Sequence, residues 1–149
     1  MCGPISYNML SKYFCTWRDD KTRFIFGVLL KQKSDTATKF SEFLEHIQNQ
    51  FKITPKYLRT DRGGEYTGEE IQKILRGKGI VHETTVPDTS SENGVAERLN
   101  GLIMNKVHVL LENANLSGEF WLHAFLHAIY LLNRHLSKKL DNKTPYKLW

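Results

Sequence analysis

The sequence predicts one layered α/β domain, and three observations point to this fold class. The chain has 149 residues, a length that suits one domain. Its composition, 40% hydrophobic and 25% charged, allows a sizeable core to be buried. Runs of β-forming residues alternate with segments of helical spacing in the order β-β-α-β-α-β-α-α, which is typical of layered α/β folds.

The first part of the chain predicts a hairpin, a helix and a third strand. Residues 12–17 and 23–30 are rich in β-forming residues and flank a short polar segment, so they predict a β-hairpin. Ser34 or Asp35 is placed to cap the helix that follows. The apolar residues of this helix recur at helical spacing: Phe40, Phe43, Leu44 and Ile47. Residues 53–60 predict the third strand.

The middle of the chain predicts a crossover between parallel strands. A second helix opens at Thr67 or Gly68 and ends at Gly77 or Gly79. Residues 80–86 then predict a short strand. Parallel pairing requires a crossover connection, and this helix supplies it. We therefore expect the strands on either side of the helix to share one sheet.

The last part of the chain predicts a loop and two helices. The polar residues 87–94 predict a loop, and a long helix follows from about Val95 to Glu112. A final helix from Glu119 to Asn133 has apolar residues on most faces, which predicts a well-buried helix. The remaining tail is polar until its last residues.

Composition limits the possible functions only loosely. The chain has 21 Lys and Arg against 16 Asp and Glu, and the resulting net charge of +5 favours a polyanionic partner. Cys2 and Cys15 stand alone, without zinc-finger spacing, and are expected to be reduced thiols. No apolar run is long enough to cross a membrane, and the N-terminus does not resemble a secretory signal.

Two acidic residues stand where chemistry is possible. Asp61 directly follows a predicted strand and precedes two glycines, a position that suits either a ligand site or an ordinary turn residue. Glu97 is predicted in the first turn of the long helix, where a glutamate either meets a ligand or interacts favourably with the helix dipole. Taken singly, each residue is better explained by its local structural role.

Helix geometry indicates that Glu97 points away from the core. At 100° per residue, Glu97 shares one face with four residues, namely Gly101, Met104, Asn105 and His108. The apolar residues gather on the opposite side: Val95, Leu99, Ile103, Val107 and Leu110. Lys106 falls inside this apolar arc, which predicts a side chain that extends along the surface to reach water.

The spacing of the two acidic residues carries a resemblance to a known family. Thirty-five residues separate Asp61 from Glu97. The stretches LRTDRGGEY at 58–66 and ENGVAERLNG at 92–101 resemble the second and third acidic motifs of the D,D-35-E integrases, in the form found in Ty/copia-type retrotransposons. Further matches follow in order along the whole chain: CGP at 2–4, YFCTWRDDKTR at 13–23, FW at 120–121, YLLNR at 130–134 and TPYKLW at 144–149.

This resemblance implies that residues 1–149 are an integrase catalytic core, a fragment of a Pol polyprotein. The implied fold is RNase H-like, with a mixed sheet flanked by helices. The implied chemistry is metal-dependent phosphodiester cleavage and strand transfer, with two Mg²⁺ (or Mn²⁺) ions held by carboxylates. Carried over by position, Asp61 and Glu97 are the catalytic metal ligands, and the loop at 87–94 resembles the family's mobile catalytic loop. Plausible DNA contacts are Asn93, Arg98, Asn100 and Lys106.

The resemblance also implies partners and a location. The family acts on the cDNA ends of the element and on target DNA, and its members work as homo-oligomers on DNA ends. No membrane is involved. The expected location is the nucleus, after a stage in a cytoplasmic virus-like particle.

The sequence departs from the family at its beginning. The family's first catalytic Asp lies just before the CGP motif, so that residue and its central strand are expected upstream of Met1. On this interpretation the chain as written is poorly stable and inactive, because a ligand is missing and two sheet edges are unpaired. Asp19 and Asp20 match the turn after the second family strand and are read as structural.

Two further departures lie near the acidic pair. Arg62 stands where the family commonly has Asn, and its guanidinium could pair with Asp61 and compete with a metal. Gly101 stands where copia-type relatives often carry a basic residue, which weakens the long helix and removes a DNA contact.

Two alternatives to an active integrase core stay open. The first is a non-catalytic nucleic-acid-binding or assembly module, a degraded or domesticated copy that kept the fold. The second is a related RNase H-like nuclease or transposase. His123 and His127 lie four apart on the last predicted helix, but without an HExxH pattern they do not predict a metal site.

Overall fold

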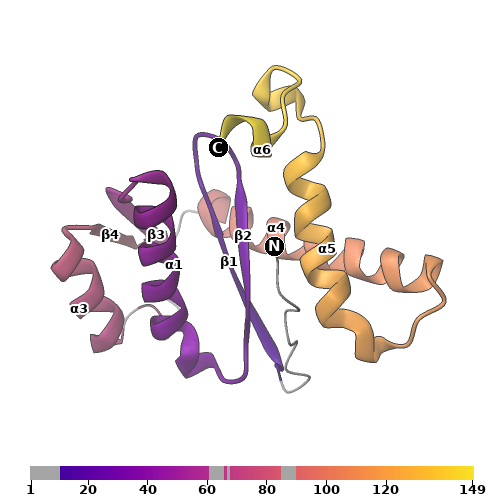
Figure 1. Ribbon diagram of the computed structural model, residues 1–149, viewed down its shortest axis with the longest axis horizontal. Coiled ribbons are helices and arrows are strands. Elements are labelled where there is room, and N and C mark those ends of the chain that lie inside the picture. Colours follow the sequence, from indigo (N-terminus) through magenta and orange to yellow (C-terminus); the bar gives the residue numbers. More distant parts are fainter. Residues whose placement is uncertain (1–10, 61–65, 67, 85–89) are drawn as a thin grey trace. The chain divides into compact units, whose positions relative to one another are not determined.

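The computed structural model describes residues 11–60, 66, 68–84 and 90–149 (Figure 1). The chain divides into two compact units. Described residues up to Leu29 and from Glu97 onward form the first unit, and those between Leu30 and Ala96 form the second. No helix among the described residues has the length and apolar character needed to cross a membrane.

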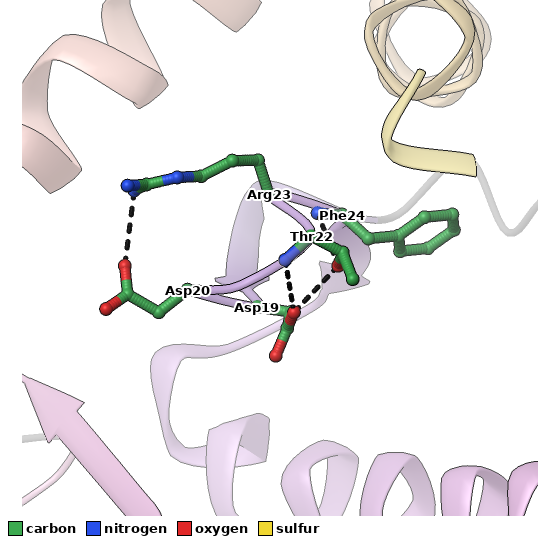
Figure 2. A network of polar contacts seen from close by, with 5 residues as sticks. All are labelled: Asp19, Asp20, Thr22, Arg23 and Phe24. Carbon is green, nitrogen blue, oxygen red and sulfur yellow. Dashed lines mark hydrogen bonds and ion pairs between the residues drawn. The ribbon is translucent and has the colours of Figure 1, made fainter. Parts of the chain in front are cut away.

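The first unit begins with a hairpin of β1 (Tyr13–Arg18) and β2 (Ile25–Leu30), which pair as a two-stranded sheet. Figure 2 shows the turn between them. The Asp19 carboxylate accepts hydrogen bonds from the backbone N–H and the hydroxyl of Thr22, both at 2.7 Å. Arg23 adopts a positive φ of 62° and pairs with Asp20 at 3.2 Å. Asp19 therefore acts as a turn residue, as its sequence position predicts.

Two helices supply the core of the first unit. They are α4 (Ser90–Asn113) and α5 (Trp121–Arg134), which follows a short 3-10 turn at Gly118–Phe120. The most deeply buried side chains, with no exposed surface, are Ile103, Val107, Phe125 and Ala128. They pack with Ile25 of β2 in one apolar cluster. The predicted core face of the long helix is confirmed at positions 103 and 107, whereas Val95 is 36% exposed.

Close approach between β2 and α5 explains the glycine in the strand. A Cβ built on Gly27 would lie 2.0 Å from Cδ1 of Ile129 and 3.1 Å from the ring of Phe125. Glycine usually weakens a strand, but here it allows the backbone to lie directly against the helix.

Asn133, near the end of α5, bonds to the backbone of β2. Its Oδ1 accepts a hydrogen bond from the N–H of Ile25, and its Nδ2 donates to the carbonyl of the same residue, both at 2.8 Å. Asn133 is only 3% exposed. One side chain thus satisfies both backbone groups of a buried strand residue, as a neighbouring strand would do.

The segment after α5 folds back onto the hairpin. A bridge pairs Ser137 with Lys143, and the short helix α6 (Pro145–Leu148) follows, with the Thr144 side chain accepting from the backbone N–H of Lys147. The ring of Trp149 then stacks on Phe24, at 5.4 Å between centroids. The tail predicted only as polar is therefore an ordered part of the first unit.

Among the described residues, the second unit is built mainly from helices α1 and α3 and the strands β3 and β4. A 3-10 turn at Lys33–Asp35 leads into α1 (Thr36–Phe51), and α3 (Glu69–Lys78) ends at Gly79, whose φ is 66°. The strands β3 (Tyr57–Thr60) and β4 (Val81–Thr84) pair in parallel, with Thr60 opposite Thr84. The core side chains, at most 2% exposed, are Phe40, Leu44, Ile47, Ile71 and Leu75.

The predicted order of elements is confirmed, including the parallel crossover through α3. The described strands form two separate two-stranded sheets rather than one pairing that includes all four. The strand predicted at 53–60 is shorter, because it starts only at Tyr57, after Pro55, which cannot donate a backbone hydrogen bond.

The loop predicted at 87–94 needs correction. Residues 85–89 lie outside the described residues, but helix α4 already begins at Ser90. Serine and acidic residues are favourable in a first helical turn, so the polar SSEN run suits a helix start as well as a loop.

Candidate active site

Asp61 itself lies outside the described residues, but the strand that leads to it is described. β3 ends at Thr60, the residue before Asp61, and Thr60 is 9% exposed. The parallel register places Leu58 beside His82 and Arg59 beside Glu83 on β4. β3 therefore ends at the residue that precedes Asp61 in the sequence, and the predicted end of the strand at Thr60 is confirmed.

A chain of hydrogen bonds holds the end of β3. The Oγ1 of Thr60 lies 2.8 Å from Nε2 of His82, and Nδ1 of the same ring lies 2.8 Å from Nε2 of Gln72 on α3. The Gln72 amide nitrogen also donates to the carbonyl of Tyr66, at 3.4 Å. Because an amide nitrogen only donates, His82 Nδ1 must accept, and the ring proton sits on Nε2 and is donated to Thr60.

This set of hydrogen bonds could not be predicted from the sequence. Its members come from β3, β4 and α3, and no spacing rule brings them together. Its effect is to tie the last residue of β3 to both neighbouring elements. A second link across the strands, the ion pair of Arg59 with Glu83 at 3.0 Å, is exposed and contributes little to stability.

Glu97 lies on the exposed face of α4, as helix geometry predicts. Its side chain is exposed, and within the described part of the chain no hydrogen bond or ion pair engages its carboxylate. Because α4 starts at Ser90, Glu97 is in the second turn and not in the first turn as predicted. The helix dipole acts mainly within the first turn, so dipole stabilisation explains this glutamate less well than its sequence position indicated.

The proposed DNA contacts differ in their surroundings. Arg98 is exposed, and Lys106 is half-buried, as expected for a lysine that falls inside the apolar arc and extends toward water. The Oδ1 of Asn100 accepts a hydrogen bond from the Thr16 hydroxyl of β1 at 3.1 Å, which ties α4 to the hairpin. Asn93 belongs to α4, but its side chain is outside the described set.

The described acidic, histidine and cysteine side chains are spread along the chain. Among them, no group of three or more His, Cys, Asp or Glu side chains gathers at one place. Glu97 offers one carboxylate that no described side chain pairs with, and a carboxylate is the kind of hard oxygen donor that Mg²⁺ prefers. His123 and His127 are exposed, and His127 stacks on Tyr130 at 6.0 Å between centroids. The described residues by themselves therefore form no metal site, and Glu97 contributes a single carboxylate.

Comparison with known proteins defines the class. Residues 2–90 match the Integrase core domain family, so the chain belongs to that family. It is 38% identical, over its whole length, to the Retrovirus-related Pol polyprotein from transposon TNT 1-94 of Nicotiana tabacum. It is 32% identical, over 91% of its length, to the Retrovirus-related Pol polyprotein from transposon RE2 of Arabidopsis thaliana. The predicted relationship to retrotransposon Pol polyproteins of the Ty/copia type is confirmed.

The chain spans only a small part of these relatives, 11% of the first and 9% of the second. Its match within them is to the integrase core domain of a retroelement Pol polyprotein, a domain that serves DNA integration at the level of the family.

Solved structures confirm the RNase H-like fold. The HTLV-2 integrase catalytic core domain in complex with magnesium, in its trimeric form, matches with a TM-score of 0.67 and 24% identity, over 90% of this chain and 83% of that one. A chain of the simian T-cell lymphotropic virus intasome in complex with PP2A regulatory subunit B56 gamma matches with a TM-score of 0.70 and 23% identity, over 91% of this chain and 47% of that one.

Proposed function

We propose that this chain is part of a catalytic core that cuts and joins DNA, with Asp61 and Glu97 as two of the ligands of its divalent metal ions. The observation that carries the proposal is the state of Glu97: a carboxylate on the non-core face of α4, exposed and unpaired within the described residues. A surface glutamate is ordinary by itself. Its distance of 36 positions from Asp61, a residue that directly follows a paired strand, is what the family shares.

The chain's own residues would divide the work. Asp61 and Glu97 would hold Mg²⁺ or Mn²⁺, which in such sites stabilises the attacking and leaving oxygens of an in-line displacement at phosphorus. The hydrogen-bond chain through His82 would fix the strand end next to Asp61. Arg98 and Lys106 would contact the DNA backbone, and Asn93 and Asn100 would contribute polar contacts near Glu97.

Strand transfer measures this proposal directly. The assay joins a labelled duplex that carries the element's end to a plasmid, in Mg²⁺ or Mn²⁺, with this chain and with a longer polypeptide that includes the residues upstream of it in the relatives. Asp61→Asn and Glu97→Gln should each abolish joining. Glu112→Gln removes an exposed carboxylate from the other end of α4 and should leave joining unchanged.

Two results would count against the site. One is joining that survives Asp61→Asn. The other is equal loss of joining in Glu97→Gln and Glu112→Gln, which would mean a general effect of charge. If the longer polypeptide binds DNA but does not join it with either metal, the result favours the alternative function, a non-catalytic nucleic-acid-binding or assembly module.

The partners and location follow from the same proposal. DNA ends of the element and target DNA are the expected substrates, and the working form is a homo-oligomer assembled on DNA. Action in the nucleus, after a stage in a cytoplasmic particle, is the matching location. Sedimentation of the chain with and without the labelled duplex would show whether DNA promotes assembly, and microscopy of a tagged copy would test the location.

A further inference from the structure

The C-terminal segment concentrates the positive charge of the chain. Residues 134–149 contain five Lys and Arg, namely Arg134, Lys138, Lys139, Lys143 and Lys147, against the single acidic residue Asp141. These 16 residues therefore carry +4 of the net +5, and the other 133 residues are almost neutral. All five basic side chains are exposed.

This segment is folded and not a loose basic tail. Leu140 is 8% exposed, and Pro145 is buried as well. The backbone N–H of Asn142 donates to the carbonyl of Ser137 at 3.0 Å, within the turn that the bridge at Ser137 closes. Trp149 anchors the end of the segment on the hairpin rings. The basic side chains consequently project from a fixed backbone.

Arg134 is held by two tyrosine rings. Its Cζ lies 3.8 Å from the ring centroid of Tyr130 on α5 and 4.0 Å from that of Tyr146 on α6. Both tyrosines are more than half exposed, at 51% and 57%. Contact with aromatic rings restrains the side chain but uses none of the guanidinium N–H groups, and within the described residues no hydrogen bond or ion pair engages them.

An arginine restrained in this way is preorganised for phosphate. The guanidinium presents a planar fork of N–H donors that matches two phosphate oxygens, and a side chain already fixed loses less entropy when it binds. The exposed rings of Tyr130 and His127 extend the surface along α5, since positions 127, 130 and 134 lie on one helical face. Exposed rings beside cations are features of nucleic-acid-binding surfaces.

We propose that Arg134, its two tyrosines and the lysines of residues 138–147 form a binding surface for the phosphodiester backbone of nucleic acid. This surface is separate in sequence from the contacts proposed on α4, and it requires neither metal nor Asp61. A second copy of the same face is a poorer partner, because each copy would bring a charge of +4 and repel the other.

The experiment measures binding of a fluorescent random-sequence DNA duplex to the full chain by anisotropy across a salt series. EDTA is present, so that a metal-dependent site does not contribute. The test variant is Lys138→Gln/Lys143→Gln/Lys147→Gln. The matched control, Lys73→Gln/Arg76→Gln/Lys78→Gln, removes three exposed cations from α3 and leaves the same net charge.

Each lost phosphate contact should lower the slope of log K against log salt by about 0.9, so the test variant should lose a slope of roughly 2 to 3. The control should keep nearly the original slope. Equal slopes in the two variants would overturn the proposal, because binding would then reflect net charge alone.

Substitutions at the arginine separate stacking from charge. Arg134→Lys keeps the charge but loses the planar fork, and Tyr146→Leu removes one ring, which should weaken binding by roughly 2- to 5-fold. Tyr146→Phe keeps the ring and should bind as the parent does. Circular dichroism confirms that each variant is folded. If Arg134→Lys changes sedimentation but not DNA binding, the face joins copies of the chain and the proposal is wrong.

These results are independent of catalysis. A chain inactive in strand transfer could still show the salt-slope difference, and an active chain could lack it. Failure of this proposal and failure of the proposed catalytic function are therefore distinguishable.

Discussion

Replacement of Asn133 tests how far the first unit depends on one buried amide. In Asn133→Ala, the N–H and the carbonyl of Ile25 both lose a partner at 2.8 Å, in a place where the asparagine is 3% exposed. A buried backbone group left without a partner costs about 1–3 kcal/mol, so the two together should cost about 2–6 kcal/mol of unfolding free energy. This loss is a large part of the total unfolding free energy of a typical domain, which is about 5–15 kcal/mol.

Guanidinium unfolding followed by circular dichroism gives the measurement. The control is Asn105→Ala, because Asn105 is an exposed residue on α4 and its loss should change stability by no more than about 0.5 kcal/mol. A loss of less than about 1 kcal/mol in Asn133→Ala would refute the reasoning, since water or a rearranged backbone would then satisfy Ile25.

Asn133→Asp sharpens the test through pH. The carboxylate would still accept from the N–H of Ile25, but its second oxygen would face the Ile25 carbonyl, and burial would raise the pKa of the new carboxyl. The protonated acid can donate to that carbonyl. Because the folded pKa would lie above the unfolded value of about 3.9, the variant should come closest to the parent below pH ~4 and lose stability as pH rises through the folded pKa.

The remaining predictions concern the strand–helix contact and the strand end beside Asp61. Gly27→Ala should lower the unfolding free energy by about 1–3 kcal/mol, because the new Cβ would lie 2.0 Å from Ile129 and the neighbouring Phe125 ring limits any shift. Adding Ile129→Val should recover part of this loss, as measured by chemical denaturation. His82→Leu should expose the amides of β3 and β4 to faster hydrogen exchange, because the Thr60 hydroxyl and the Gln72 amide lose their shared partner, at a cost of about 1–3 kcal/mol. Unchanged exchange in that variant would show that the strand end does not depend on the imidazole.

Local signals predicted most of the elements. The polar run between two β-rich stretches identified the hairpin. Two candidate residues were predicted for each end of α3, and the structure places Gly68 at its start and Gly79 at its end. The start of α4 was misjudged because Ser, Glu, Asn and Gly in a row favour a loop and a helix start about equally when judged locally. For the same reason Glu97 was placed in the first turn, although it lies one turn further along.

Contacts between distant residues could not be predicted. The i, i+4 spacing pairs Tyr130 with Arg134, but Tyr146 reaches that arginine only because the tail folds back. Likewise, 108 positions separate Asn133 from Ile25, and an asparagine near a helix end gives no sign that it serves a strand. In the candidate site, spacing and resemblance predicted Asp61 and Glu97, whereas the hydrogen bonds of His82 became evident only from the coordinates.

Because α4 is continuous, the direction of the Glu97 side chain depends on its rotation around the helix axis relative to the buried residues. The same helix carries Glu97 and, six residues later, the fully buried Ile103. Because the helix is continuous between them, the packing of Ile103 in the core determines the direction in which Glu97 points around the helix axis. Inserting one residue between them would turn Glu97 by about 100° and shift it by about 1.5 Å, without altering any residue of the core. Four inserted residues would return it to within about 40° of its original direction, about 6 Å further out. The direction of the Glu97 side chain therefore depends on the number of residues between Glu97 and the buried Ile103, as well as on the sequence spacing from Asp61.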